Sequence, residues 1–460
     1  MVAHANPLLL IENCLQAISL IKSQVDGAQV LKVKIQENLM QAQIELQECA
    51  GAIDKERLSS ARDILEEVKT IVLHINPRKL KMTFMPYKYS MWDSLESIYI
   101  AAQECNNISV DLIPVPYWSK DSENNLDKFF NESEYFEEKY PILNYDVLAG
   151  DYCGDVLFVH NPFDGLNNLT TIDDRFYLKN LRGRFSKIIY VPYYVATSFP
   201  SFESFIGENI YPNMVYLDKI ITLNSKHAAL FEACGIPSAS LEIQGSPKID
   251  ALLDQTQMKP PKLERWSASI AGKKVFLLNT TLGTLLNKEG YFDRLKSVIS
   301  QLLDDNEIAL IWRPHPLFDD LIDKSFPEYR ATYDSFKDLV ASAPNAYLDT
   351  YHNAIPALQL ADAMISETSA LLRQYAALHR PILMMDDVEM AEDEQLHIFD
   401  YRHLDSMSSS GDLKNFIRNV KTGDPALKER AASSSVSLYN TEGTVGQKIV
   451  QSCLQEFEML

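Results

Sequence analysis

Apolar residues recur at alternating steps of three and four along the first 76 residues, which is the spacing of one face of a helix. The clearest run is Leu31, Ile35, Leu39, Ala42, Leu46, Cys49 and Ile53. Asp26-Gly27 and Gly51 interrupt the pattern, as helix-breaking residues do. The pattern predicts a helical extension over residues 1–76, as a hairpin or a coiled coil. It either mediates homo-oligomerisation or membrane docking, or packs as an appendage on the next domain.

From residue 81 the period changes to short apolar runs separated by helical stretches. These runs predict buried strands at residues 82–85, 110–115, 155–160, 187–192, 219–223 and 241–244. Buried strands that alternate with helices are typical of a parallel, doubly wound sheet. The polar stretch 119–139, rich in Asn, Asp and Glu, predicts a surface loop. We therefore expect a first Rossmann-like domain over residues 77–257.

The adjacent Pro260 and Pro261 predict an interdomain linker over residues 258–270. After it, apolar runs predict strands at residues 274–278, 308–312, 361–365 and 381–385, the last of which closes the sheet. Helices after Gly411 are expected to cross back onto the first domain. The predicted fold is thus α/β, with a second Rossmann-like domain over residues 271–460 that faces the first across a cleft.

Composition narrows the functions that such a fold can have. The formal net charge of −20 argues against non-specific nucleic-acid binding, which needs a cationic surface. The six cysteines are scattered without a C-x-x-C pair, and no apolar window reaches the length of a membrane span, as expected for a cytoplasmic protein. The sequence has no P-loop, G-x-S-x-G, H-E-x-x-H or Cys/His cluster with metal spacing, so NTPase, serine hydrolase and zinc-enzyme functions are unsupported.

The run from Ile308 to Trp312 leads directly into Arg313-Pro-His-Pro316. Prolines end the strand, so we expect Arg313 and His315 just past its carboxyl end, where open α/β sheets bind ligands. A guanidinium beside an imidazole suits a phosphate-bearing ligand. The alternative is a buried strand whose Arg only reaches solvent.

Three other predicted strands end in small polar residues that suit an anion. One end carries Ser366, Glu367, Thr368 and Ser369, although ordinary helix capping needs only one of these hydroxyls. The other two ends carry further candidates, namely Thr280, Thr281, Gly245, Ser246 and Lys248.

The first domain supplies candidates for the opposite side of the cleft. Ser90 and Asp93 have the spacing of a capping box that opens a helix. Residues expected to face the cleft there are Lys88, Trp92, Asp93 and Tyr193. The alternative for Trp92 is a place in the core.

Arg313-Pro-His-Pro316, followed about 50 residues later by Ser366-Glu-Thr-Ser369 and then by Pro381-Ile-Leu, resembles the CDP-glycerol glycerophosphotransferase family of teichoic acid synthesis. The resemblance covers roughly residues 215–390. It implies a GT-B-like fold, a CDP-linked polyol donor, a glycan or lipid-linked acceptor, and neither cofactor nor catalytic metal. Glu367 stands where the family has Asp. The family's Trp-His-Gly segment, whose His is thought to be the acceptor base, is replaced by Tyr190-Val-Pro-Tyr-Tyr194.

The resemblance implies a cytoplasmic transferase that moves glycerol phosphate, or another polyol phosphate, to a cell-surface precursor of teichoic acid or capsule. Arg313 and His315 would bind the donor pyrophosphate together with Ser366, Thr368 and Ser369 of the segment Ser366–Ser369, called the serine loop below. His160 or Asp164, next to a neighbouring strand end, would take the acceptor proton, unless His160 is only structural. A lipid-linked acceptor would bring the enzyme to the inner face of the membrane. Three alternatives stay open: a GT-B glycosyltransferase with a different nucleotide-sugar donor, an epimerase-like GT-B enzyme and an inactive GT-B scaffold.

Overall fold

The computed structural model describes residues 29–49, 54–75, 79–121, 123–196, 198–254, 270–282, 290–351, 353–385, 396–407 and 410–457. The chain divides into two compact units, Met1–Lys79 and Leu80–Leu460. Except for Ile270, the predicted linker lies outside the described residues, as does the break expected at Asp26-Gly27. None of the described helices combines the length and the apolar content needed to span a bilayer.

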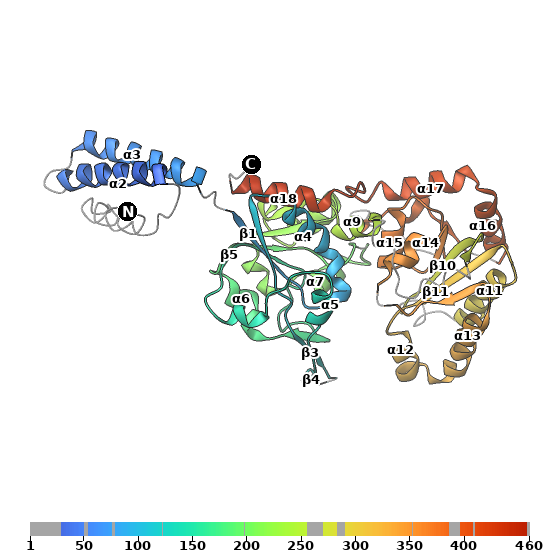
Figure 1. The fold of residues 1–460 in the computed structure, drawn as a ribbon. Helices are drawn as coiled ribbons and strands as arrows, with labels where there is room; N and C mark the ends of the chain where they lie inside the picture. The colour runs from blue at the N-terminus through green and yellow to red at the C-terminus, as the bar shows by residue number, and fades with distance from the viewer. Residues whose placement is uncertain are drawn as a thin grey trace. The chain divides into compact units, whose positions relative to one another are not determined.

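The first unit contains a helical hairpin of α2 (Gln29–Cys49) and α3 (Lys55–Ile75), drawn in blue in Figure 1. Its small core is made of the residues that the heptad-like spacing places on one face, namely Leu39, Ala42, Leu46, Cys49, Ala61 and Val68. Arg57 of α3 pairs with Glu45 of α2 at 3.1 Å, which supports the packing of the two helices.

The second unit opens with a parallel six-stranded sheet in the order β2-β1-β5-β7-β8-β9. Its strands are the six that the apolar runs predict: β1 (Leu80–Met85), β2 (Ile108–Leu112), β5 (Gly154–Val159), β7 (Phe185–Tyr190), β8 (Lys219–Thr222) and β9 (Leu241–Ile243). Alternate residues of β5 pack on opposite faces: Phe158 belongs to the core under α4 (Glu96–Gln103), and Leu157 to the core under α6 (Leu178–Leu181). Both faces are therefore covered, as expected of a doubly wound sheet.

The sequence predicted a surface loop over residues 119–139, and this prediction was wrong. The stretch contains β3 (Tyr117–Lys120), β4 (Leu126–Phe130) and α5 (Ser133–Glu137), and β3 pairs antiparallel with β4 and with β6 (Thr170–Ile172). Aromatic pairs join β3 and β4, because Tyr117 stacks on Phe130 and Trp118 contacts Phe129, each at 5.0 Å between ring centroids. These pairs outweigh the polar composition of the stretch.

A second parallel sheet follows, in the order β12-β11-β10-β13-β14-β15. Four strands match predicted runs: β10 (Lys274–Thr280), β11 (Ile308–Pro314), β13 (Ala363–Ser366) and β14 (Ile382–Met384). Two were missed, β12 (Ala346–Leu348) and β15 (Asp405–Ser406), so residues 381–385 do not close the sheet. Phe276 and Leu278 pack toward α11 (Tyr291–Leu303) and α13 (Arg330–Ser342), whereas Leu277 packs toward α14 (Ile355–Leu360) and α15 (Ala370–Ala376).

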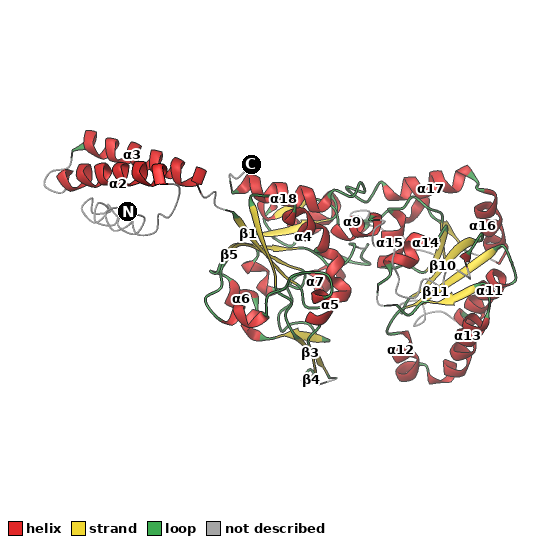
Figure 2. Cartoon of the chain, in the orientation of Figure 1, coloured by secondary structure: helices red, strands yellow, loops and turns green. Residues whose placement is uncertain are grey.

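Helices surround both sheets (Figure 2). Those not yet delimited are α7 (Phe202–Asn209), α8 (Ser225–Ala233), α9 (Pro247–Leu253), α12 (Phe318–Ser325), α16 (Ser410–Thr422), α17 (Pro425–Ser435) and α18 (Val445–Glu456). The two predicted Rossmann-like halves are thus present.

The last helix, α18, packs against α4 of the first sheet, as the expected return of the C-terminal helices requires (Figure 1). A Cβ placed on Gly446 would lie 2.4 Å from the backbone of Ser97, so only glycine permits this approach. The carboxylate of Asp250 in α9 accepts hydrogen bonds from the backbone N–H groups of Val445 and Gly446. These contacts fix the start of α18.

Candidate functional site

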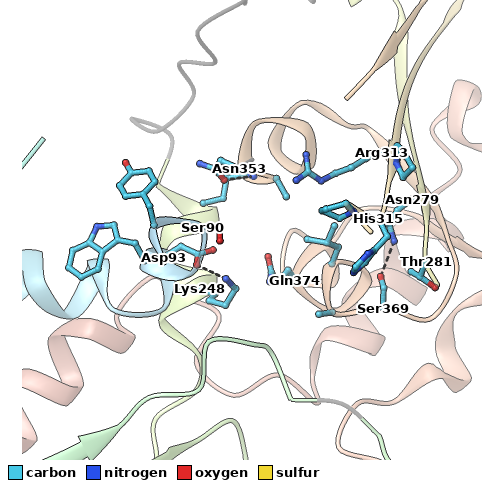
Figure 3. Close-up of a pocket in the computed structure, with 18 of the residues that line it drawn as sticks. Ser90, Asp93, Lys248, Asn279, Thr281, Arg313, His315, Asn353, Ser369 and Gln374 are labelled. Carbon is cyan, nitrogen blue, oxygen red and sulfur yellow. Dashed lines mark hydrogen bonds and ion pairs between the residues drawn. The ribbon is translucent and has the colours of Figure 1, made fainter. Parts of the chain in front are cut away.

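A pocket of about 530 Å³ lies among the carboxyl ends of β10, β11 and β13 and the loops that follow β1 and β9. This is an ordinary size for a small-ligand site. In Figure 3, Ser90, Asp93 and Lys248 of the first sheet's loops face His315, Ser369 and Thr281 of the second. The position matches the rule that open α/β sheets bind ligands at this edge.

Arg313 lines the pocket, but it lies within β11 rather than past its end, because the ladder with β10 continues to Pro314. The residue is 7% exposed, and its guanidinium donates to Asp349 at 2.6 Å. Asp349 is fully shielded and follows β12. The buried ion pair holds the Arg313 side chain in one orientation at the pocket wall.

His315 also lines the pocket, on the turn after β11. Its backbone N–H donates to the carbonyl of Thr280, and its Nδ1 accepts from the backbone N–H of Leu317 at 3.1 Å. An accepting Nδ1 leaves the proton of the neutral ring on Nε2. Burial, together with the charge of Arg313, lowers the pKa of His315, so the neutral ring with an Nε2–H donor is favoured.

The serine loop joins β13 to α15 and is organised from beneath by Asn279. The Asn279 amide donates to Ser366 Oγ at 2.9 Å and to Ser369 Oγ at 3.0 Å. Ser369 caps α15 by accepting from the backbone N–H of Leu372. Thr368 and Ser369 line the pocket, whereas Ser366 is fully buried below it.

Glu367 and Thr280 support the pocket but do not line it. The Glu367 carboxylate is buried and accepts from Thr281, from the backbone N–H at 2.6 Å and from the hydroxyl at 2.8 Å. It therefore fixes Thr281, which does line the pocket. The Thr280 hydroxyl is buried and accepts from Nε1 of Trp312. Thr280 is a core residue, although the sequence predicted a binding role.

On the first-sheet side, Asp93 and Lys248 form an ion pair at the pocket wall (Figure 3). Trp92 is 2% exposed, so it is both a core residue and part of the lining. Ser90 caps no helix: residues Tyr89–Ser94 form a 3-10 helix that starts after Lys88, and α4 begins only at Glu96. The capping-box prediction was wrong because this turn is tighter than an α-helix.

Three candidates were predicted just after β9, namely Gly245, Ser246 and Lys248, and among the described lining residues of the pocket Lys248 alone is present. Gly245 has φ +93°, and a Cβ there would lie 2.4 Å from the carbonyl oxygen of Tyr439. Ser246 is buried at the start of α9. Gly245 thus permits close packing between two chain segments, and it is not among the described residues that line the pocket.

His160 does not reach the pocket, although the sequence made it a candidate base. Its ring is completely buried, its Nε2 accepts from the backbone N–H of Tyr87 at 3.3 Å, and its Nδ1 lies 3.2 Å from Ser94 Oγ. Burial lowers the pKa of His160 to about 3. The ring is hydrogen-bonded to the segment after β1 and is not among the described residues that line the pocket.

Asp164, Lys88 and Tyr193 also lie outside the pocket lining as the described residues define it. Asp164 has φ +51° and accepts from the backbone N–H of Leu178 at 3.2 Å. Burial raises its pKa to about 6. Lys88 lies over the ring of Tyr117, and Tyr193 packs edge-on against Phe163.

Several lining residues were missed by the sequence analysis: Glu96, Lys139, Asn279, Asn353 and Gln374. Asn279 pairs with Ser366 in the ladder between β10 and β13, so a polar residue directly after one predicted strand was the available signal. Lys139 lies in the stretch that was taken for a surface loop. Within the described ranges, no group of His, Cys, Asp and Glu side chains could hold a metal ion.

Two doubly wound sheets with a cation- and hydroxyl-lined pocket at their carboxyl edges define an enzyme of the GT-B class. The family model described as CDP-glycerol:poly(glycerophosphate) glycerophosphotransferase matches residues 206–455, more than half of the 460 residues. The chain belongs to this family. The prediction of a glycerophosphotransferase that uses CDP-glycerol is therefore confirmed, and no comparison supports another donor or an inactive scaffold.

Solved structures share the fold at low sequence identity. A UDP-N-acetylglucosamine 2-epimerase described as putative, from Listeria monocytogenes, has a TM-score of 0.56 at 12% identity and covers 83% of this chain and 98% of its own. The UDP-N-acetylglucosamine 2-epimerase from Neisseria meningitidis has a TM-score of 0.55 at 12% identity, and the match covers 82% of this chain and 100% of that enzyme. The wall teichoic acid polymerase TagF has a TM-score of 0.52 at 15% identity, and the match covers 86% of this chain and 97% of TagF. No curated protein sequence matches the chain significantly.

Proposed function

We propose that the pocket binds the pyrophosphate of CDP-glycerol through Arg313, His315, Thr368 and Ser369, with Thr281 beside them. The observation that carries this assignment is that these side chains, from three neighbouring strand ends, line one cavity. Arg313 and Nε2–H of His315 supply donors to phosphate oxygens, and the two hydroxyls of the serine loop add more. Asp349 and Asn279 act as positioning residues.

In the proposed reaction, an acceptor hydroxyl attacks the phosphorus that carries the glycerol. A new P–O bond forms, the P–O bond to the bridging oxygen breaks, and CMP leaves with the electron pair. Arg313 and His315 stabilise the negative charge that develops on CMP. The acceptor proton goes to a general base on the first-sheet side of the pocket.

For this base we propose Asp93, in place of His160 and Asp164. Asp93 faces the donor-binding side chains, and its ion pair with Lys248 orients the carboxylate. Lys248 would also draw the phosphates of an acceptor toward the pocket. Glu96 is the other carboxylate in the described lining, but it accepts a hydrogen bond from the hydroxyl of Tyr140.

Calorimetric titration with CDP-glycerol, CDP-ribitol, UDP-sugars and CMP tests the donor assignment. We expect cytidine-selective binding that His315→Ala weakens strongly. Asp93→Asn should still bind CDP-glycerol but lose transfer activity, whereas the exposed control Glu134→Gln should keep both. Equal transfer rates in Asp93→Asn and wild type would contradict the proposed base.

We also propose that the enzyme works in the cytoplasm at the inner face of the membrane, with a lipid-linked glycan as acceptor in teichoic acid or capsule synthesis. The support is the family's polymeric product, which must be extended from a carrier. Flotation with vesicles tests this location. Recovery of the full chain only in the vesicle-free fraction would contradict it.

A further inference from the structure

A second cavity, of about 750 Å³, lies beside the carboxyl ends of β8 and β9. Three segments and Ile243 of β9 line it. The segments are the start of α8 (Asn224 to Lys226), residues between His397 and His403, and the end of α17 with the chain that follows it to Tyr439. None of its described lining residues belongs to the donor pocket.

A single side chain joins the three segments. Asn224 Oδ1 accepts from the backbone N–H of His227, which caps α8. Its Nδ2 donates to the carbonyl of Ile398 at 3.0 Å and to the carbonyl of Ser437 at 2.8 Å. The backbone N–H of Asp400 donates to Ser437 Oγ at 3.2 Å. The cavity therefore has a hydrogen-bonded frame.

The lining suits a flexible polyanion. Lys226 supplies a cation, and the rings of His397 and His403 supply hydrogen-bonding groups. Asp400, which lies 3.7 Å from His403, is the single carboxylate among the described lining residues. Ser225, Ser433 and Ser437 add hydroxyls, and apolar side chains such as Val436 and Tyr439 are well exposed. Phosphodiester oxygens can accept hydrogen bonds from the lysine, histidine and serine side chains, and short carbon units can pack against Val436 and Tyr439. The described lining contains one lysine and one carboxylate, whereas the whole chain has a net charge of −20.

One loop connects this cavity to the donor pocket. Ile243 lines the second cavity, and Lys248 lines the donor pocket. The intervening residues are held to the cavity wall, because Asn440 donates to the carbonyl of Gln244 at 3.2 Å and Gly245 packs on the backbone of Tyr439. Five residues of chain span at most about 17 Å. A ligand a few repeating units long can therefore reach from one cavity to the other.

We propose that the second cavity is a subsite for the acceptor polymer, binding phosphodiester units that were added in earlier turnovers. The proposal rests on the proposed function, since the acceptor hydroxyl would lie beside Asp93 while the rest of the polymer extends toward Lys226. Such a subsite gives a growing chain higher affinity than a single-unit acceptor.

The test uses the full chain and a synthetic oligomer of glycerol phosphate, and measures binding by calorimetry without donor. Lys226→Glu should weaken oligomer binding at least about tenfold, whereas Lys428→Glu, an equal charge change at an exposed site on α17, should not. His403→Ala should give a smaller loss. Both lysines are exposed, so folding should be preserved, as thermal unfolding can check.

Two outcomes would overturn the subsite: unchanged oligomer affinity in Lys226→Glu, or an equal loss in Lys428→Glu, which would indicate unspecific electrostatics. Because no donor is present, oligomer binding is measured independently of catalysis. If the proposed donor site is wrong, the separate titration with CDP-glycerol shows no cytidine-selective binding. In turnover assays, Lys226→Glu should raise KM for the oligomer and leave KM for CDP-glycerol and for a single-unit acceptor unchanged.

Discussion

At the scale of single residues, Asn279 shows how one buried amide organises a binding loop. Its two hydrogen bonds bring Ser366 and Ser369 together, although these serines lie on either side of the turn between β13 and α15. The serine loop thus depends on a residue from the neighbouring strand β10. Short motif matching along the sequence misses such a dependence.

We expect Asn279→Ala to weaken CDP-glycerol binding and to lower the free energy of unfolding by about 1–3 kcal/mol, since both serine hydroxyls lose a buried partner. Calorimetry and urea unfolding measure the two effects. Asn180→Ala, which removes one exposed hydrogen bond, serves as the control. Undiminished donor affinity in Asn279→Ala would show that the serine loop needs no such support.

The buried rings of His160 and His227 predict a loss of stability in acid. Burial lowers the pKa of each to about 3, against about 6.5 in an unfolded chain. Between these values the unfolded chain binds protons that the folded chain does not. The free energy of unfolding therefore falls as the pH is lowered below about 6.5, by up to about 1.4 kcal/mol per pH unit for each ring. Urea unfolding of wild type and His160→Asn tests this, because the variant should have the shallower slope.

The two histidines at strand ends also show the limit of prediction from sequence. His315 and His160 both follow a buried apolar run. One ring faces the pocket, and the 3-10 helix Tyr89–Ser94 covers the other. The difference depends on packing from another part of the chain, so the sequence pattern alone predicts strand ends but not which side chain is accessible.

At the scale of elements, the long buried strands were predictable, whereas some short or exposed strands were not. The runs behind β5 and β11 carry enough consecutive apolar residues to be read directly. By contrast, β12 and β15 have three and two residues, and every residue of β4 is exposed. β12 and β15 form because a neighbouring strand offers an edge, and β4 forms because Phe129 and Phe130 pair with aromatic side chains of β3.

The contact between α18 and α4 gives a prediction at this scale. Gly446→Ala should destabilise the protein by about 1–3 kcal/mol, because the added Cβ would meet the backbone of Ser97. Gly207→Ala, in α7, places its Cβ in open space and should be neutral or slightly stabilising. Urea unfolding of the two variants makes the comparison. Similar stabilities would show that α18 shifts without cost.

At the scale of the whole molecule, the hairpin of the first unit and the two-sheet second unit have separate cores. Every residue of the donor pocket, as far as the described chain defines it, belongs to the second unit. The chemistry should therefore not need the N-terminal helices.

Deleting residues 1–79 should leave CDP-glycerol affinity and transfer to a water-soluble acceptor unchanged. If the helices dock on a membrane, transfer to an acceptor embedded in vesicles should fall in the same variant. Calorimetry and the two transfer assays measure these effects, and vesicles without acceptor provide the control. Loss of donor binding on deletion would show that the units are not independent.

The return of α18 to the first sheet has a consequence for folding during synthesis. The face of α4 that Gly446 covers cannot be buried until residues 445–456 have left the ribosome, after both sheets have been translated. A nascent chain thus carries its N-terminal half with an uncovered apolar face for most of its synthesis. Chaperone capture should concentrate on that face, and a stop codon just before α18 should produce aggregation rather than a shortened enzyme.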